Sequence, residues 1–290
     1  MFQFLAKKCA RYSISARNVR CAARHQRNAH SAAGYRLRQE DDERERVNIG
    51  GSNDDRQTSE KIYDQLYPHH ICTTPLQKAI LTVGSGAIAL FAPWRGDMVA
   101  TFGETTASLA LKGMKEKMQR DVVGRQILQE QPRINMKTLD LPYLESLPDD
   151  TFGYAYATNF LKRYNLNPDD RPPVEFIDDA QLWYVMTRYR EVHDLLHTLL
   201  GMPTNMLGEV AVKWFEGLQT GLPMCVLGSM FSPMRFGPKF SRLYATQFLP
   251  WALNTGRNAN FYMNVYFEKE FEKPMDVLRN EMGIPPPPQM

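Results

Sequence analysis

The stretch HDLLHTLLGMPTNMLGE, residues 193–209, joins the end of one predicted helix to the start of the next. The first helix should begin at Asp178, an N-cap candidate, and end before Gly201, a typical C-terminal stop. After the Gly-Met-Pro break, Thr204 or Asn205 can cap a second helix. The stretch therefore predicts a tight helical hairpin.

Two histidines of this stretch lie on one face of the first helix. An apolar stripe at steps of three and four runs through Leu182, Met186, Tyr189, His193, Leu196 and Leu200. His193 therefore points inward, His197 lies one turn later on the same face, and Asp194 sits about 100° around the helix. Glu209, early in the second helix, can fold back against them, and Lys213 could tune the site from the next turn.

Two imidazole nitrogens with one or two carboxylates suit a divalent metal such as zinc, iron or manganese. The competing interpretation is a pair of hydrogen-bonded core histidines. We favour the metal site because two histidines at i and i+4 with an intervening acid are rarer than one buried histidine. Arg188 and Arg190, next to the motif, are candidates for holding the carboxylate or phosphate of a substrate, although surface ion pairs are the commoner role of such arginines.

Helical spacing of apolar residues continues over most of the chain, with little strand-type alternation and no internal repeat. Thr74 and Pro75 begin a helix that Pro93 ends. Further helices are predicted at 105–119, 121–130, 151–164 and 238–256. We therefore expect an all-α fold: a single compact multi-helix domain over residues 60–284, with an apolar cavity.

Two uncharged stretches, residues 79–94 and 217–234, raise the question of a membrane span. Both contain glycines and hydroxyl groups, and both fall short of the roughly 20 apolar residues that a spanning helix needs. We expect buried core helices. The alternative is that one of them lines an apolar cavity or rests in the bilayer interface, which would suit a lipid-like ligand.

The two ends of the chain differ in charge. Residues 1–39 hold nine of the 35 Lys and Arg residues and no acid, a composition typical of a mitochondrial transit peptide; a disordered basic tail is the alternative. The other 26 basic residues face 32 acidic ones, so the body is acidic, which argues against nucleic acid as a partner. Residues 40–59 read as a flexible polar linker and 285–290 as a Pro-rich tail.

The motif, HDLLH followed after eleven residues by Glu209, resembles the HDxxH-x11-E pattern of the mitochondrial coenzyme Q biosynthesis protein 4 family. The stretches LQKAILTVGSGAIAL, RGDMVATFGETT and KWFEGLQTGLPMCVLG resemble that family too. The resemblance covers roughly residues 63–284. Pro93-Trp94 departs from the Pro-Tyr pair usual in the family, outside the metal motif.

The resemblance implies an all-helical protein, peripheral on the matrix side of the mitochondrial inner membrane, with Zn²⁺ held by His193, Asp194, His197 and Glu209, the residues that would also be catalytic. It implies C1 decarboxylation of 4-hydroxy-3-methoxy-5-polyprenylbenzoate to a methoxy-polyprenylphenol. It also implies membership of a multi-subunit complex of ubiquinone biosynthesis enzymes that the protein helps to organise, and it leaves a homodimer open.

Three alternatives remain. The protein could be a non-catalytic, lipid-presenting scaffold whose metal only fixes the hairpin. The decarboxylation could be oxidative at the same carbon, which would need a redox-active ion such as Fe²⁺ or another oxidant, because zinc supplies no electrons. A metal-dependent hydrolase ranks last, because Asp194 is one methylene shorter than the general-base Glu of HExxH enzymes.

Overall fold

The computed structural model describes residues 66–289. These residues form helices and turns without a strand, so the all-α prediction is confirmed. The predicted transit peptide and linker lie outside the described residues, as do residues 60–65. The helices are α4 (Pro75–Phe91), α5 (Gly96–Thr106), α6 (Ser108–Arg120), α7 (Val122–Glu130), α8 (Leu141–Ser146), α9 (Phe152–Tyr154), α10 (Ala180–Leu199), α11 (Met206–Thr220), α12 (Pro223–Phe231), α13 (Pro238–Leu243), α14 (Leu249–Asn258) and α15 (Met275–Met282).

Helix α10 is the longest helix among the described residues and is largely buried, and it carries the two histidines of the motif. Its N-cap is Asp179, whose carboxylate accepts the N–H groups of Gln181 and Leu182, so the prediction of Asp178 was wrong by one residue. Asp178 instead accepts hydrogen bonds from side chains that precede and begin α4. Gly201 ends the helix with φ 65°, a conformation that costs glycine little.

The hairpin between α10 and α11 is built as the sequence predicts. Of the two N-cap candidates, Asn205 holds the position, and its side chain accepts the N–H of Gly208. A Cβ at Gly208 would lie 2.1 Å from the carbonyl oxygen of Pro203, so only glycine lets the turn approach the helix this closely. The turn therefore fixes how α11 returns beside α10.

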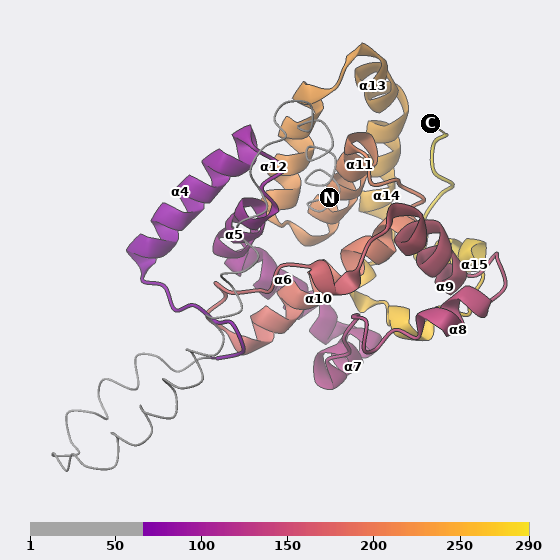
Figure 1. Ribbon diagram of the computed structural model, residues 1–290, viewed down its shortest axis with the longest axis horizontal. Helices are drawn as coiled ribbons and strands as arrows, with labels where there is room; N and C mark the ends of the chain where they lie inside the picture. The colour runs from indigo at the N-terminus through magenta and orange to yellow at the C-terminus, as the bar shows by residue number, and fades with distance from the viewer. Residues whose placement is uncertain (1–65, 290) are drawn as a thin grey trace, which may run out of the picture. The chain divides into compact units, whose positions relative to one another are not determined.

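The other helices surround this hairpin (Figure 1). Helix α11 packs against α12 and α14, α6 packs against α10 and α7, and α5 joins α4 to α12. The largest fully buried side chains are Arg188, Tyr156, Tyr184, Tyr189, Tyr262, Phe152, Phe215, Phe248 and Phe267. Their aromatic rings and the methionines of α6 make one core that reaches α10 from several sides.

Three of the predicted helices differ from expectation. The helix predicted at 105–119 is α6, which begins at Ser108, while residues 105 and 106 end α5, a helix that was not predicted. The helices predicted at 151–164 and 238–256 each contain a π-helical segment, η1 (Ala155–Lys162) and η4 (Tyr244–Phe248). Such wider turns have no sequence signal as clear as a capping residue.

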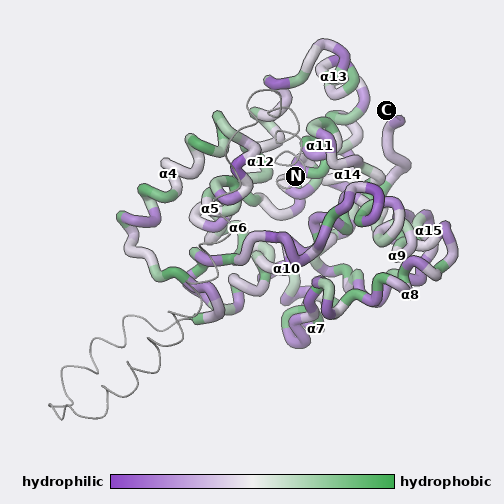
Figure 2. The backbone as a smooth tube through the Cα atoms, in the orientation of Figure 1, coloured by the Kyte–Doolittle hydropathy of each residue, from purple (hydrophilic) through white to green (hydrophobic). Residues whose placement is uncertain are grey.

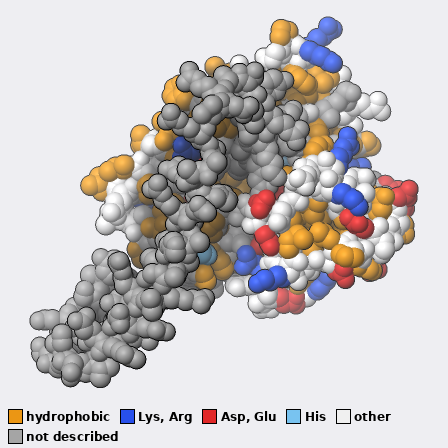
Figure 3. Space-filling model, viewed as in Figure 1, with side chains coloured by type: hydrophobic (Ala, Val, Ile, Leu, Met, Phe, Trp, Pro, Cys, Tyr) orange, Lys and Arg blue, Asp and Glu red, His pale blue; other side chains and the backbone are white. Residues whose placement is uncertain are grey.

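The expectation that residues 79–94 form a buried core helix was wrong. Helix α4 begins as predicted, with Thr74 in a capping box and Pro75 in the first turn. Among its residues only Ser85 is buried, while Leu76, Val83 and Phe91 are each more than 70% exposed. The apolar residues of α4 are visible along the chain trace (Figure 2), and orange side chains lie on the surface where α4 runs (Figure 3). Over residues 66–289, no helix combines the length and apolar character needed to cross a bilayer.

Candidate metal centre

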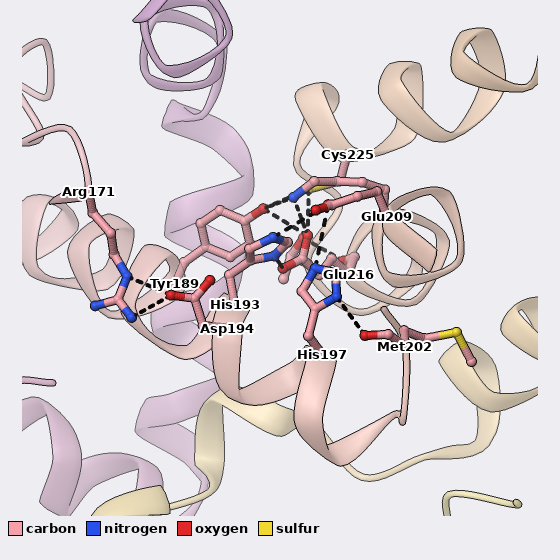
Figure 4. Close-up of polar contacts among 11 residues, drawn as sticks. Arg171, Tyr189, His193, Asp194, His197, Met202, Glu209, Glu216 and Cys225 are labelled. Carbon is pink, nitrogen blue, oxygen red and sulfur yellow. Dashed lines mark hydrogen bonds and ion pairs between the residues drawn. The ribbon is translucent and has the colours of Figure 1, made fainter. Parts of the chain in front are cut away.

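Three side chains of the α10–α11 hairpin converge on one point (Figure 4). The Nε2 atoms of His193 and His197 lie 3.7 and 3.5 Å from Oε2 of Glu209. Among the described residues, these three form a group whose candidate ligand atoms all lie within 4.8 Å of one another. His197 and Glu209 are each 1% exposed, whereas the side chain of His193 is 15% exposed, so the group is largely buried and is open to a pocket at His193.

The donor spacing fits a small divalent ion. Donors at about 2.0–2.2 Å from a tetrahedral zinc ion stand roughly 3.4 Å apart, close to the two histidine–glutamate distances. These distances are too long for good hydrogen bonds. The buried Nε2 of His197 has no hydrogen-bond partner among the described residues, which is unusual for a buried polar atom. The residues present therefore fit a metal.

The other ring nitrogen of each histidine is held by the protein. The Nδ1 atom of His197 lies 3.0 Å from the carbonyl oxygen of Met202, and Nδ1 of His193 lies 2.7 Å from Oε1 of Glu216. Phe160, from the π-helical segment η1, stacks on the ring of His197 with centroids 5.5 Å apart. Both imidazoles therefore present Nε2 to the same point, an arrangement usual for metal-binding histidines.

Asp194, the fourth predicted ligand, does not face the triad of His193, His197 and Glu209. Its Oδ2 accepts two hydrogen bonds from Arg171, at 2.7 Å from Nη2 and 3.2 Å from Nε. Arg171 also donates to the carbonyl of Ile134. The sequence predicted that Asp194 lies about 100° around α10 from the histidines. On that side of the helix its partner is Arg171, which comes from a loop distant in the sequence.

Glu216 was not among the predicted site residues, yet it is fully buried and contacts His193 of the triad. Its Oε2 accepts hydrogen bonds from Lys213 at 2.6 Å and from the hydroxyl of Tyr189 at 2.9 Å. Burial would raise the pKa of Glu216, but Lys213 and His193 hold that pKa well below its usual range. Glu216 follows Glu209 by seven positions, about two helical turns, so the two share a face of α11, and this spacing could have identified it.

The two arginines proposed for substrate binding have different surroundings. Arg188 is fully buried, forms an ion pair with Glu268 and donates to the carbonyl of Val265. Arg190 lies beside the histidines in the wall of a pocket and forms an ion pair with Glu104 at 2.5 Å. Arg171, which the sequence did not single out, lines the same pocket.

Two pockets adjoin the triad. The first, the head pocket, is lined by both histidines, Asp194, Arg171 and Arg190 together with apolar side chains. The second, the tail pocket, is a largely apolar cavity of about 380 Å³ lined by Glu209 and by residues of α4, α5, α11 and α12. Val99, Lys213 and Met224 line both pockets, so the two are neighbours across these three side chains.

Comparison with known proteins gives a consistent result. The family model described as "Coenzyme Q (ubiquinone) biosynthesis protein Coq4" matches residues 67–288. Proteins named "Ubiquinone biosynthesis protein COQ4 homolog, mitochondrial" are similar: the Rattus norvegicus one is 53% identical over 77% of this chain and 84% of its own length. The Homo sapiens one is 52% identical over the same shares, and the Aedes aegypti one 45% identical over 83% and 89%.

A solved structure from Nostoc punctiforme, provisionally named as a ubiquinone biosynthesis protein, has a similar fold. Its TM-score is 0.57 at 17% sequence identity, and the match covers 73% of this chain and 99% of that chain. At this identity the likeness supports the helical fold alone.

Proposed function

We propose a function from one premise: the chain belongs to the coenzyme Q (ubiquinone) biosynthesis protein Coq4 family, and it acts in ubiquinone biosynthesis. The proposed activity is C1 decarboxylation of 4-hydroxy-3-methoxy-5-polyprenylbenzoate to a methoxy-polyprenylphenol, with a bound divalent metal. We further propose that the protein works at the matrix face of the inner membrane, in a complex with other enzymes of the pathway.

His193, His197 and Glu209 would hold the metal, and Asp194 is proposed as the fourth ligand. Zinc fits two imidazoles and carboxylates best. When bound, the metal supplies a Lewis acid for a carboxylate or phenolate and acidifies water. As a ligand, Asp194 would have to leave Arg171, whose guanidinium would then be available to an anion.

The head pocket has the chemistry to orient a benzoate. Arg190 and Arg171 carry fixed positive charge in its wall, and planar guanidinium groups bind carboxylates through paired hydrogen bonds. In the reaction, the bond between C1 and the carboxylate breaks and carbon dioxide leaves. A proton adds at C1 so that this bond can break, and it replaces the carboxylate on the ring, so the step needs no oxidant.

The tail pocket has the chemistry for a polyprenyl chain. Much of its wall comes from the two uncharged stretches of the sequence, now seen in α4 and α12, including Leu90, Leu227 and Phe231. An apolar cavity next to a polar one suits an amphipathic substrate with its ring at the triad and its tail away from it. The adjacency of the two pockets to the buried triad is the observation that carries the proposal.

The test is conversion of a short-tailed 4-hydroxy-3-methoxy-5-prenylbenzoate by the zinc-loaded full chain, followed by mass spectrometry. A product that lacks the carboxyl group should form with the parent and be lost in the His193→Ala, His197→Ala variant. The exposed His69→Ala variant, which leaves the triad intact, should retain activity. A product that carries a hydroxyl group in place of the carboxylate would indicate the oxidative reaction, with molecular oxygen as the oxidant.

A lipid-presenting scaffold is the second candidate, and the exposed apolar residues of α4 favour it. Such a protein would bind the prenylated benzoate and hand it to a partner enzyme without turning it over. Tight binding of the compound by a folded, metal-loaded parent that forms no product would select this candidate over the decarboxylase.

A further inference from the structure

We propose that Glu216 is a positioning residue for the metal centre: it fixes the ring of His193, and Lys213 and Tyr189 hold Glu216 in place. The proposal rests on the metal site proposed above, but it concerns side chains outside the ligand set. It assigns a task to a buried charged cluster that the four-residue motif does not include.

The contact between Glu216 and His193 determines which imidazole nitrogen faces the triad. With Nδ1 at 2.7 Å from Oε1 of Glu216, only Nε2 is available to the point that Glu209 also faces. A carboxylate behind a histidine ligand orients the ring and increases the electron density at the free nitrogen. Figure 4 shows Glu216 among the side chains gathered around His193.

Glu216 is itself held by three groups. Its Oε2 accepts hydrogen bonds from Lys213 and Tyr189, and the thiol of Cys225 lies 3.5 Å away. Lys213 also donates to the hydroxyl of Tyr189 at 3.0 Å. Because each partner contacts another, the carboxylate cannot rotate without breaking several hydrogen bonds at once.

Fold stability alone is a weak reason for this cluster. Replacing a buried ion pair with apolar side chains of similar volume is often neutral or stabilising, because removing two charges from water is costly. Glu216 is 0% exposed and the side chain of Lys213 is 10% exposed, so both charges are desolvated. Orientation of the adjacent ring of His193 would explain why the ion pair of Lys213 and Glu216 is present despite its desolvation cost.

The two histidines are held differently. Behind His197 stands a neutral backbone carbonyl, that of Met202, whereas behind His193 stands a carboxylate. Glu216 therefore makes His193 the stronger donor of the two, and its loss should weaken the site through His193 alone. The side chain of Glu216 can be replaced by mutation, whereas the backbone carbonyl of Met202 cannot, so the proposal can be tested at His193.

The experiment measures binding of Co²⁺ and Zn²⁺ to the full chain by chelator competition, together with the visible absorption spectrum of the Co²⁺ form. The Glu216→Gln variant should bind each metal 10–100-fold more weakly than the parent and show a shifted Co²⁺ spectrum. The Glu216→Gln, Lys213→Met double variant, which leaves no unpaired buried charge, should keep the fold and still bind weakly.

Glu268→Gln is the matched control. Like Glu216→Gln, it removes a carboxylate from an ion pair with a buried cation, here Arg188, but Glu268 contacts no residue of the triad. It should destabilise the protein and leave metal affinity and spectrum at parental values. Parental affinity and spectrum in both Glu216 variants would overturn this proposal and leave the metal site standing. A parent that binds neither metal would overturn the metal site and this proposal together.

Discussion

At the scale of single residues, two buried tyrosines differ in whether their hydroxyl groups form hydrogen bonds. Tyr189 and Tyr262 are both almost fully buried, yet only the hydroxyl of Tyr189 has hydrogen-bond partners among the described residues. Burial raises the pKa of both phenols, so neither ionises at neutral pH and each hydroxyl must be satisfied or pay for its desolvation. The two residues therefore make a matched pair for substitution.

Tyr189→Phe should lower the free energy of unfolding by about 1–3 kcal/mol, because Lys213 and Glu216 lose a buried partner. Tyr262→Phe should be neutral or raise it by up to about 1 kcal/mol, because it removes a hydroxyl without a partner. Urea unfolding followed by tryptophan fluorescence measures both. Equal destabilisation in the two variants would contradict the cluster described here.

At the scale of elements, glycine marks where helices approach closely and where they do not. In α7, a Cβ at Gly124 would lie 2.4 Å from the carbonyl oxygen of Met118 and 2.6 Å from Oδ1 of Asn264. In the middle of α6, a Cβ at Gly113 would meet no atom within 4 Å. The first glycine is required by packing, whereas the second only weakens its helix.

Gly113→Ala should raise the free energy of unfolding by about 0.5–1 kcal/mol, through helix propensity alone. Gly124→Ala should lower it by about 1–3 kcal/mol, because the added methyl group forces α6 and α7 apart. Thermal unfolding by circular dichroism gives the sign of each change. A gain of stability in Gly124→Ala would mean that the α6–α7 turn is looser than described.

The elements also show what the sequence could and could not predict. The α10–α11 hairpin was predictable because the residues that end one helix and cap the next, Gly201 and Asn205, act within a few residues of the turn. The division between α5 and α6 at Ala107 was not, because alanine gives no stop signal. The exposure of α4 and the contact between Asp194 and Arg171 depend on segments distant in the chain, so periodicity could not reveal them.

At the scale of the whole molecule, metal binding should couple to global stability, because the triad joins two helices of the core. Free Zn²⁺ at 100 times its dissociation constant should add about 2.7 kcal/mol, or a Tm increase of about 5–10 °C, that excess chelator removes. The His193→Ala, His197→Ala variant should show no such difference. A Tm that does not respond to zinc in the parent would contradict the proposed centre.

Selectivity for the substrate tail should also be a property of the whole fold, because the tail pocket is shared by four helices. Gly228 lines this pocket, and an added side chain there meets open space. Gly228→Leu should keep the fold but weaken binding of long-tailed benzoates at least several-fold, with tail-less 4-hydroxy-3-methoxybenzoate unaffected. Gly113→Leu, at an open position that lines neither pocket, is the control; isothermal titration in detergent measures both.

The three donors of the triad come from one seventeen-residue stretch, which has a consequence for the order of folding. Closing so short a loop costs little chain entropy, and contacts between near neighbours form early. We therefore expect the hairpin to gather its donors before the remaining helices dock, so that an ion can bind while the chain folds. We expect the metal held by the proposed centre to depend on the ions present while the protein folds. Refolding in defined metals should give a different occupancy from soaking the folded protein.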